Sequence, residues 1–258
     1  FMSTEVLIVE EVLVEGASPE GGVISVWTLN RPDKLNALNS DSHIAIKEQC
    51  VKAESDDNVR CIVIRGAPPM EPKEGKRAKP PAFAAGADIS EFSGKNSDDV
   101  RPFFAENAWE AVWNVSKPTI AMVDGFALGG GTELALSCDI RISSERSTFG
   151  QPEINLGLIP GGGGTQRLCR LIGYGKTMEI VLSGGMISSD EALEIGIVNR
   201  IVSHQELESK TMELAMEIAN KSPYVTRVAK RVVRGALDLP FSEGILMERS
   251  EFVALFDT

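Results

Sequence analysis

The sequence predicts an α/β fold, because runs typical of buried strands alternate with segments of helical spacing. Short apolar stretches rich in β-branched residues, such as 59–65 and 119–123, are typical of strands. This alternation favours short crossovers between strands, and it gathers ligand sites at the turns that leave the strands. The length of 258 residues fits one domain, or one domain with a helical appendage.

The first two thirds of the chain should contain a hairpin followed by alternating helices and strands. Strands over 5–14 and 23–29 flank the turn-rich segment 16–22, which predicts the hairpin. Apolar spacing and capping residues then give the later elements. These are a helix over 39–53, a strand over 59–65, a helix over 98–115, a strand over 119–123, a helix over 131–137 and a strand over 140–143.

After about residue 175 the pattern becomes mostly helical. We therefore divide the chain into a first part, 1–174, and a C-terminal helical region, 175–258. A stripe of apolar residues on one of these helices is typical of core or of subunit contact. The stripe consists of Leu207, Met212, Leu214, Ala215 and Ile218. The helices expected in this region cover 176–182, 189–195, 205–220, 225–237 and 241–255.

The composition limits the classes of partner. The formal net charge of -11 argues against a nucleic-acid groove or an anionic membrane as the main partner. No stretch of about 20 apolar residues can span a bilayer, and the N-terminus lacks the basic start and apolar core of a secretion signal. We therefore expect a soluble, cytoplasmic protein.

The cysteines and histidines suggest neither a metal site nor a disulfide framework. The cysteines lie far apart and lack CxxC spacing, which favours a reducing compartment. The only imidazoles belong to His43 and His204, for which surface or satisfied structural roles are expected. The cysteines are Cys50, Cys61, Cys138 and Cys169.

Two turns rich in small residues are candidates for binding an oxygen that gains negative charge. The run 125–135 reads as a strand, a sharp glycine turn and the start of a helix, which leaves unpaired backbone N–H groups facing one point. The segment 83–89 is a second turn that can bring backbone N–H groups close to a ligand. Together the two turns can form an oxyanion hole with two donors.

Two carboxyl groups accompany these turns. Glu133 directly follows the glycine run, and Glu153 lies twenty positions further on. Carboxyl groups that share a partly desolvated site titrate apart, so one can hold a proton while the other accepts one. The alternative is that Glu133 is a favourable first-turn acid of a helix and that Glu153 is a solvated loop residue.

Several ordered segments resemble the signatures of the enoyl-CoA hydratase/isomerase (crotonase) family, most closely its short-chain hydratases. These segments are 29–38, 83–89, 127–135, 149–153 and 159–167. The resemblance implies a spiral of repeated ββα units. It also implies that 1–174 is a catalytic core that binds acyl-CoA, and that 175–258 builds trimers, commonly paired into hexamers.

The resemblance also implies the chemistry, which is the addition of water to a 2-enoyl-CoA. Ala87 and Gly130 would present backbone N–H groups to the thioester oxygen. Glu133 would accept a proton from water while Glu153 delivers one to the α-carbon, with the roles exchanged in dehydration. No metal or redox cofactor is implied, because coenzyme A is part of the substrate.

The resemblance assigns further residues to contacts with coenzyme A, although turn-forming or structural roles are alternatives for each. Lys34, Leu35 and Ala37 match the segment that meets the adenine end. Ala85, Asp88 and Ile89 match positions around the nucleotide and pantetheine, and Gly161 would let the chain pass close to the acyl group. A basic loop over 68–81 is a candidate phosphate contact or a solvated surface loop. Its cations are Lys73, Lys76, Arg77 and Lys79.

Other functions remain open at the level of sequence. A Δ3,Δ2-enoyl-CoA isomerase can shift a proton with one acidic residue, so the presence of two favours hydration. A scaffold that binds acyl-CoA or RNA without turnover is a further alternative.

We expect short substrates, such as crotonyl-CoA or 3-hydroxypropionyl-CoA in the dehydrating direction. The chain length accepted depends on how Phe92, the helix from residue 98 and Trp113 are arranged. The sequence stops short of the Lys/Arg-rich final helix usual in the family, which leaves the completeness of the coenzyme A site open at the level of sequence.

Overall fold

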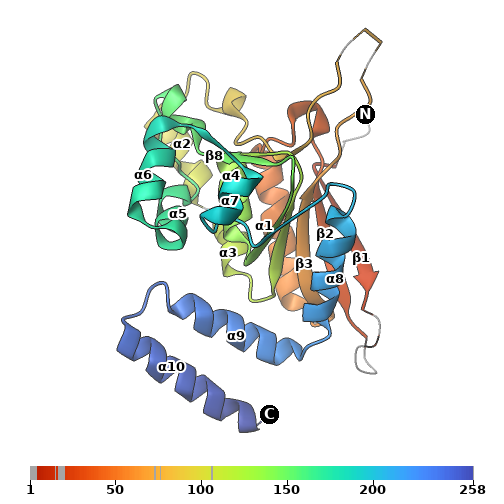
Figure 1. Cartoon of the computed structure of the whole chain (residues 1–258), viewed down its shortest axis with the longest axis vertical. Coiled ribbons are helices and arrows are strands. Elements are labelled where there is room, and N and C mark those ends of the chain that lie inside the picture. Colours follow the sequence, from red (N-terminus) through yellow and green to blue (C-terminus); the bar gives the residue numbers. More distant parts are fainter. Residues whose placement is uncertain are drawn as a thin grey trace.

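The computed structural model describes residues 5–14, 16, 21–72, 74, 75, 77–105 and 107–257. Two β-sheets form the centre of this part of the chain (Figure 1). The six-stranded sheet has the order β1 (Leu7–Leu13), β2 (Val23–Leu29), β3 (Val59–Gly66), β5 (Thr119–Val123), β7 (Ile140–Ser144) and β10 (Arg200–Val202). The four-stranded sheet has the order β4 (Ala82–Ala84), β6 (Phe126–Leu128), β8 (Thr148–Gly150) and β9 (Met186–Ser188).

The chain passes back and forth between the two sheets in a repeated ββα pattern. The successive pairs β3 and β4, β5 and β6, and β7 and β8 each place one strand in each sheet, and the repeats pair in parallel. Helices follow every pair, namely α2 (Ser97–Ala105) and α3 (Ala108–Asn114), then α4 (Gly130–Ser137), then α5 (Gly164–Ile172). The predicted α/β fold and its spiral of ββα units are therefore confirmed.

The N-terminal elements also follow the prediction. β1 and β2 form an antiparallel hairpin in which Leu7 lies opposite Leu29. Helix α1 (Ser40–Ser55) begins after Asn39, whose side chain accepts a hydrogen bond from the Ser42 N–H at 3.0 Å and so caps the first turn.

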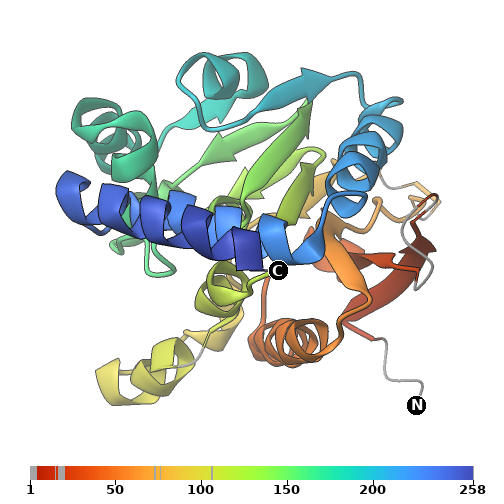
Figure 2. The same ribbon diagram turned by 90° about the horizontal axis from the view of Figure 1, so that it is seen from below.

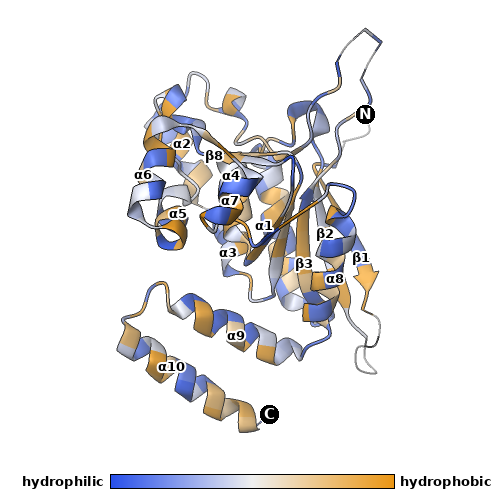
Figure 3. Ribbon diagram, in the orientation of Figure 1, coloured by the Kyte–Doolittle hydropathy of each residue, from blue (hydrophilic) through white to orange (hydrophobic). Residues whose placement is uncertain are grey.

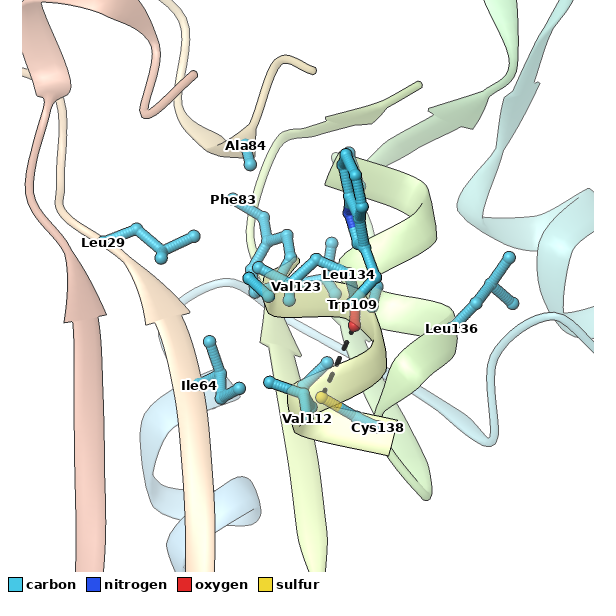
Figure 4. Packing of buried hydrophobic residues seen from close by; sticks show 14 of the residues in the cluster. Leu29, Ile64, Phe83, Ala84, Trp109, Val112, Val123, Leu134, Leu136 and Cys138 are labelled. Carbon is cyan, nitrogen blue, oxygen red and sulfur yellow. Dashed lines mark hydrogen bonds between the residues drawn. The ribbon is translucent and has the colours of Figure 1, made fainter. Parts of the chain in front are cut away.

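The buried residues form two clusters, one on each face of the six-stranded sheet. Strand β3 shows the division, because Ile62 and Ile64 belong to the cluster that contains α1, α3 and α4, whereas Cys61 and Val63 belong to the other. Figure 4 shows the first cluster around Trp109. Helix α8 (Leu207–Ala219) covers the second cluster with the predicted apolar stripe, which is therefore core.

The prediction of one helix over 98–115 is wrong, because the structure has two helices, α2 and α3, in this segment. Asn107 starts the second helix by accepting a hydrogen bond from the Glu110 N–H at 2.9 Å. The Ala108 N–H donates instead to the imidazole of His43 at 3.1 Å. Capping by Asn107 thus separates two helices that apolar spacing alone had joined.

The C-terminal region contains more than helices. Its helices are α6 (Tyr174–Ser183), α7 (Ser189–Glu194), α8, α9 (Pro223–Gly235) and α10 (Phe241–Ala254), close to the predicted bounds. Strands β9 and β10 were not predicted, and they add to the two sheets. The sheets therefore continue past residue 175.

Helices α9 and α10 form an antiparallel pair at one end of the molecule (Figures 1 and 2). Helix α10 has no buried residue, and apolar residues recur along it (Figure 3). Its exposed apolar side chains include Phe241, Leu246, Phe252 and Val253. The structure thus leaves an apolar helix face uncovered at this end.

Candidate active site

The glycine turn between β6 and α4 is held against strand β4. Gly129 caps α4 with a φ of 50°, a conformation that favours glycine. A Cβ atom on Gly131 would lie 1.9 Å from the carbonyl oxygen of Ala84, so no side chain fits there. All eight residues of α4 are buried. The N-terminus of α4 is therefore fixed inside the molecule.

The second predicted turn meets the first. Leu38 pairs with Ala87 through hydrogen bonds from the Leu38 N–H to Gly86 O and from the Asp88 N–H to Leu38 O, both 2.8 Å long. This bridge leaves the N–H of Ala87 without an acceptor among the described residues. The Ala87 nitrogen lies 3.2 Å from the point where a Cβ on Gly130 would stand. The two backbone segments predicted to bind an oxyanion thus lie side by side.

Glu133 is a buried acid at the start of α4. Its side chain is 2% exposed, and its Oε1 accepts hydrogen bonds from the N–H groups of Gly162 and Gly164 at 2.7 and 2.8 Å. Burial raises the pKa of Glu133 to about 7, and the charge of Glu153 adds to this rise. The two hydrogen bonds and the charge of Arg167 oppose it. Glu133 is therefore a first-turn acid of α4, as the alternative had it, but one that is buried and has a raised pKa.

Glu153 lies at the same glycine turn. It belongs to the 3-10 helix η3 (Pro152–Leu156), and its Oε1 is 2.8 Å from the point where a Cβ on Gly129 would stand. Burial raises the pKa of this half-buried carboxyl group as well. The charge of Glu153 contributes to the raised pKa of Glu133, as expected for neighbouring carboxyl groups.

Gln151 lies between the two acids and was not singled out by the sequence analysis. When the side-chain amide nitrogen of Gln151 faces Glu153, it donates to both carboxylate oxygens of Glu153, at 3.0 and 3.1 Å. The other end of the amide lies 2.5 Å from the point where a Cβ on Gly164 would stand, and Oε1 of Glu133 is 3.0 Å from that point. Gln151 is fully buried. Its amide is thus the side chain that lies between the two carboxyl groups.

Trp109 on α3 supports the turn at Gly130 and the loop at Gly162, and it was also not singled out. Its Nε1 donates to the carbonyl oxygen of Gly130 at 2.8 Å. Its ring lies against Gly130 and Gly162, where an added Cβ would come within 3.0 and 2.4 Å of ring atoms. No sequence motif signals this contact, because Trp109 and Gly130 are 21 positions apart.

An aromatic cluster lies next to these glycines. Phe104 stacks on Trp109 with ring centroids 6.2 Å apart, and its ring lies 2.9 Å from the point where a Cβ on Gly161 would stand. Phe103 connects Phe104 to Phe92 through edge contacts of 5.2 and 5.1 Å. These side chains form an aromatic wall, which contains Phe92 and part of the helix from residue 98, two of the features on which the accepted chain length was expected to depend.

Trp113 does not join this wall. The guanidinium groups of Arg167 and Arg234 lie over its ring at 4.8 and 3.9 Å. A cavity of about 720 Å³ lies on this side, between α4, α5 and α9, and it is lined in part by Trp113, Arg167 and Arg234. Neither Glu133 nor Glu153 lines this cavity.

The residues assigned to coenzyme A come together on two adjacent segments. The Ala85 N–H donates to Leu35 O at 3.0 Å, so the segments around 34–38 and 85–89 lie side by side. Leu35 itself adopts a left-handed conformation, with a φ of 53°. Lys34 and Ile89 are exposed. Ala37 is half-buried, and Gly161 is exposed at the edge of the aromatic wall.

Asp88 has a structural partner. Its carboxylate forms an ion pair of 2.8 Å with Arg31 and caps the 3-10 helix η2 (Ile89–Glu91) through Ser90. Hydrogen bonds from Ser90 and from Arg31 lower the pKa of Asp88. The carboxylate of Asp88 is therefore engaged within the protein, and its backbone is the part that faces the neighbouring turn.

The described part of the basic loop reaches the same segments. Lys79 donates a hydrogen bond to the carbonyl oxygen of Asp33, in the 3-10 helix η1 (Pro32–Lys34). Lys73 and Lys76 lie outside the described residues.

No helix among the described residues is long and apolar enough to cross a membrane.

The two sheets joined by ββα units, with two backbone turns and two carboxyl groups at one point, define a protein of the crotonase type. Comparison with known proteins gives the family. The family model described as Enoyl-CoA hydratase/isomerase matches residues 19–258. The chain therefore belongs to the enoyl-CoA hydratase/isomerase family.

Individual relatives agree with this assignment. The chain is 38% identical over 239 residues to the short-chain-enoyl-CoA hydratase of Clostridium acetobutylicum, covering 92% of this chain and 87% of that protein. It is 41% identical over 259 residues to a probable enoyl-CoA hydratase of Rhizobium meliloti, covering 100% and 92%. The crystal structure of enoyl-CoA hydratase from Bacillus anthracis superposes with a TM-score of 0.86 at 33% identity, covering 98% and 92%.

Proposed function

We propose that this protein is an enoyl-CoA hydratase, which adds water reversibly to a 2-enoyl-CoA and gives the 3-hydroxyacyl-CoA. One observation carries the proposal: Glu153 lies against the turn that holds Gly129 and Gly130, next to the N–H of Ala87, and the buried amide of Gln151 lies between the carboxyl groups of Glu153 and Glu133. Hydration needs one group that takes a proton from water and one that gives a proton to carbon, next to donors for the oxyanion.

The backbone donors polarise the substrate. The N–H groups of Ala87 and Gly130 donate to the thioester oxygen, so electron density moves from the double bond toward that oxygen and the β-carbon becomes electrophilic. Each preorganised donor of this kind lowers a barrier by about 3 kcal/mol. Because both donors belong to the main chain, replacing a side chain does not remove them.

The two acids move the protons. The oxygen of water bonds to the β-carbon while Glu133 takes a proton from that water, and the electron pair of the double bond passes into an enolate held by the two N–H groups. The enolate then collapses as Glu153 gives its proton to the α-carbon. A pKa of about 7 for Glu133 suits a base that works near neutral pH. This scheme uses no cofactor beyond the coenzyme A of the substrate.

The acyl group of the substrate is short in this proposal. The stacked rings of Phe104 and Trp109 close the side of the site next to Gly161 and Gly162. The segments around 34–38 and 85–89, with Lys34, Leu35, Ala37, Ala85, Asp88 and Ile89, bind the coenzyme A portion. Crotonyl-CoA, or 3-hydroxypropionyl-CoA in the reverse direction, is the expected substrate.

A homotrimer, or a hexamer of two trimers, is the proposed assembly. The uncovered apolar side chains of α10 support it, because large exposed apolar faces mark interaction sites. A cytoplasmic location is proposed as well, and the absence of disulfides among Cys50, Cys61, Cys138 and Cys169, which are free thiols, is compatible with it.

The test compares two products from purified protein. Incubation with crotonyl-CoA should remove the absorbance of the conjugated thioester and yield 3-hydroxybutyryl-CoA. Incubation with a 3-enoyl-CoA should give little 2-enoyl-CoA. Rapid isomerisation without hydration would instead favour the isomerase, and binding of crotonyl-CoA with unchanged absorbance would favour a scaffold.

A further inference from the structure

Arg167 on α5 contacts the loop that carries the two hydrogen-bond donors of Glu133. Its Nη1 donates to the carbonyl oxygen of Gly162 at 2.7 Å. The N–H of the same residue, Gly162, donates to Oε1 of Glu133 at 2.7 Å. The guanidinium also lies against Gly163, where an added Cβ would be 2.3 Å from Nη1. The glycine loop is thus held between a carboxylate on one side and a guanidinium on the other.

The far side of Arg167 is held by α3 and α9. Its guanidinium lies 4.8 Å from the centre of the Trp113 ring, and that of Arg234 lies 3.9 Å from the same ring. Arg234 in turn forms an ion pair of 2.7 Å with Asp139. Cation–π contacts and an ion pair therefore link the glycine loop to helix α9, which belongs to the C-terminal pair.

We propose that Arg167 is a positioning residue, which fixes the loop 162–164 and thereby the carboxylate of Glu133, with the ring of Trp113 holding the guanidinium in place. This inference rests on the proposed function, because it assigns Arg167 a role through the base of the hydration reaction. Helix α9 reaches the same Trp113 ring through Arg234.

The charges around the pair predict how the role can be measured. Glu133 is faced by Glu153 from η3 and by Arg167 from α5. Arg167 is faced by Glu133 from α4, by Glu110 from α3, by Arg234 from α9 and by the thiol of Cys138. Since the charge of Arg167 lowers the pKa of Glu133, loss of that charge raises this pKa further above its ordinary value.

The experiment replaces Arg167 with Met or Lys and measures kcat/KM for crotonyl-CoA against pH. In Arg167→Met we expect kcat to fall about tenfold and the acidic limb to move to higher pH by about half a unit or more. Arg167→Lys keeps the charge, so the limb should return toward its wild-type position. Arg170→Met makes the same change on the same helix without contact to Gly162, and it should leave kcat and the limb unchanged.

A second readout separates this inference from the proposed function. The carboxyl band of Glu133, identified in infrared spectra by its loss in Glu133→Gln, can be titrated without substrate. Its midpoint should rise in Arg167→Met even if wild type fails to hydrate crotonyl-CoA, in which case only the proposed function fails. If Arg167→Met does not fold, Trp113→Leu should shift the midpoint in the same direction. An unchanged midpoint and unchanged acidic limb in a folded variant would overturn the positioning role.

Discussion

At the scale of single residues, Glu133 shows how opposing effects set the chemistry. Two N–H groups donate to its carboxylate and favour the charged form, and Arg167 does the same, but burial and the charge of Glu153 outweigh them. The result is a carboxyl group with a pKa of about 7, which can both accept and release a proton near neutral pH. The glycine loop thus orients the acid without removing its proton affinity.

This balance predicts a stability change in Glu133→Gln. The folded-state pKa of about 7 lies above the ordinary value of 4.5 for a glutamate. The stabilising contribution of Glu133 is therefore complete below pH 4.5 and is lost as the pH rises through 7. Above pH 7 the buried charge costs on the order of 3 kcal/mol. Gln retains an oxygen that can accept from Gly162 and Gly164 but carries no charge.

Urea unfolding at several pH values checks this prediction. The variant should be more stable than wild type at pH 8, and the difference should shrink as pH falls toward 4.5. Glu179→Gln, which changes an exposed acid on α6, provides the control and should show little difference. A variant that is less stable than wild type at pH 8 would contradict the account.

At the scale of elements, close contact between α4 and β4 builds the oxyanion turn. Gly131 permits that contact, because an added Cβ would lie 1.9 Å from the carbonyl oxygen of Ala84. The two elements belong to adjacent ββα units, so the spiral itself brings the turns together. A change at this contact should disturb Gly130 without touching either acid.

Gly131→Ala is therefore expected to destabilise the protein by about 1–3 kcal/mol and to lower kcat for hydration. The matched control is Gly175→Ala, since Gly175 is also the second residue of its helix and has no atom within 4 Å of an added Cβ. That variant should be neutral or slightly more stable. Thermal unfolding and crotonyl-CoA turnover of both variants check the prediction. Equal stability of the two would show that the contact between α4 and β4 is not critical.

The element α2 should set the length of the acyl group. Phe104 stacks on Trp109 and lies against Gly161, so Phe104→Ala opens the wall of the proposed acyl pocket. We expect the ratio of kcat/KM for octenoyl-CoA to that for crotonyl-CoA to rise about tenfold. Phe252→Ala, far away on α10, should leave the ratio unchanged. An unaltered ratio in Phe104→Ala would place the pocket elsewhere.

At the scale of the whole molecule, the last helix, α10, has no buried residue. Phe252 and Val253 on α10 are 61% and 65% exposed, and the helix contacts its neighbour α9 at one end of the molecule (Figure 2). Apolar side chains in this position are stabilised by burial against another surface. The proposed trimer supplies such a surface.

The prediction at this scale concerns assembly. Phe252→Glu should shift the mass measured by light scattering from trimer or hexamer toward monomer, because a charge would be buried in the interface. Val51→Glu places the same charge at an exposed apolar residue of α1, away from α10, and it should leave the mass unchanged. A wild-type protein that is monomeric at micromolar concentration would contradict the assembly.

The sequence predicts the parts of this molecule whose signals are local. The glycine run next to Glu133 and the turn before Asp88 predict the two backbone turns. The alternation of strand and helix patterns predicts the α/β fold, whereas the spiral followed only from the resemblance to the family. The cap at Asn107 was overlooked, because apolar spacing continues through it. Strands β9 and β10 are three residues long each, too short to show a period.

Contacts between distant segments could not be predicted. The bond from Trp109 to Gly130 depends on how α3 meets α4, which no spacing reveals. The bond from Arg167 to Gly162 spans only five positions, but its link to Glu133 depends on the bond from Gly162 to Glu133, which spans 29. The same holds for Asp88, whose ion pair with Arg31 spans 57 positions. The structure therefore adds the residues that support the site, whereas the two acids themselves are visible in the sequence.

The most direct measurement is kcat for the hydration of crotonyl-CoA by wild type, Glu133→Gln and Glu153→Gln, followed through the absorbance of the conjugated thioester. Each substitution removes one proton carrier, so we expect each to lower kcat by about 100-fold to 10,000-fold, with unchanged circular dichroism. Glu179→Gln should behave as wild type. Hydration at the wild-type rate by either variant of Glu133 or Glu153 would contradict the two-acid mechanism.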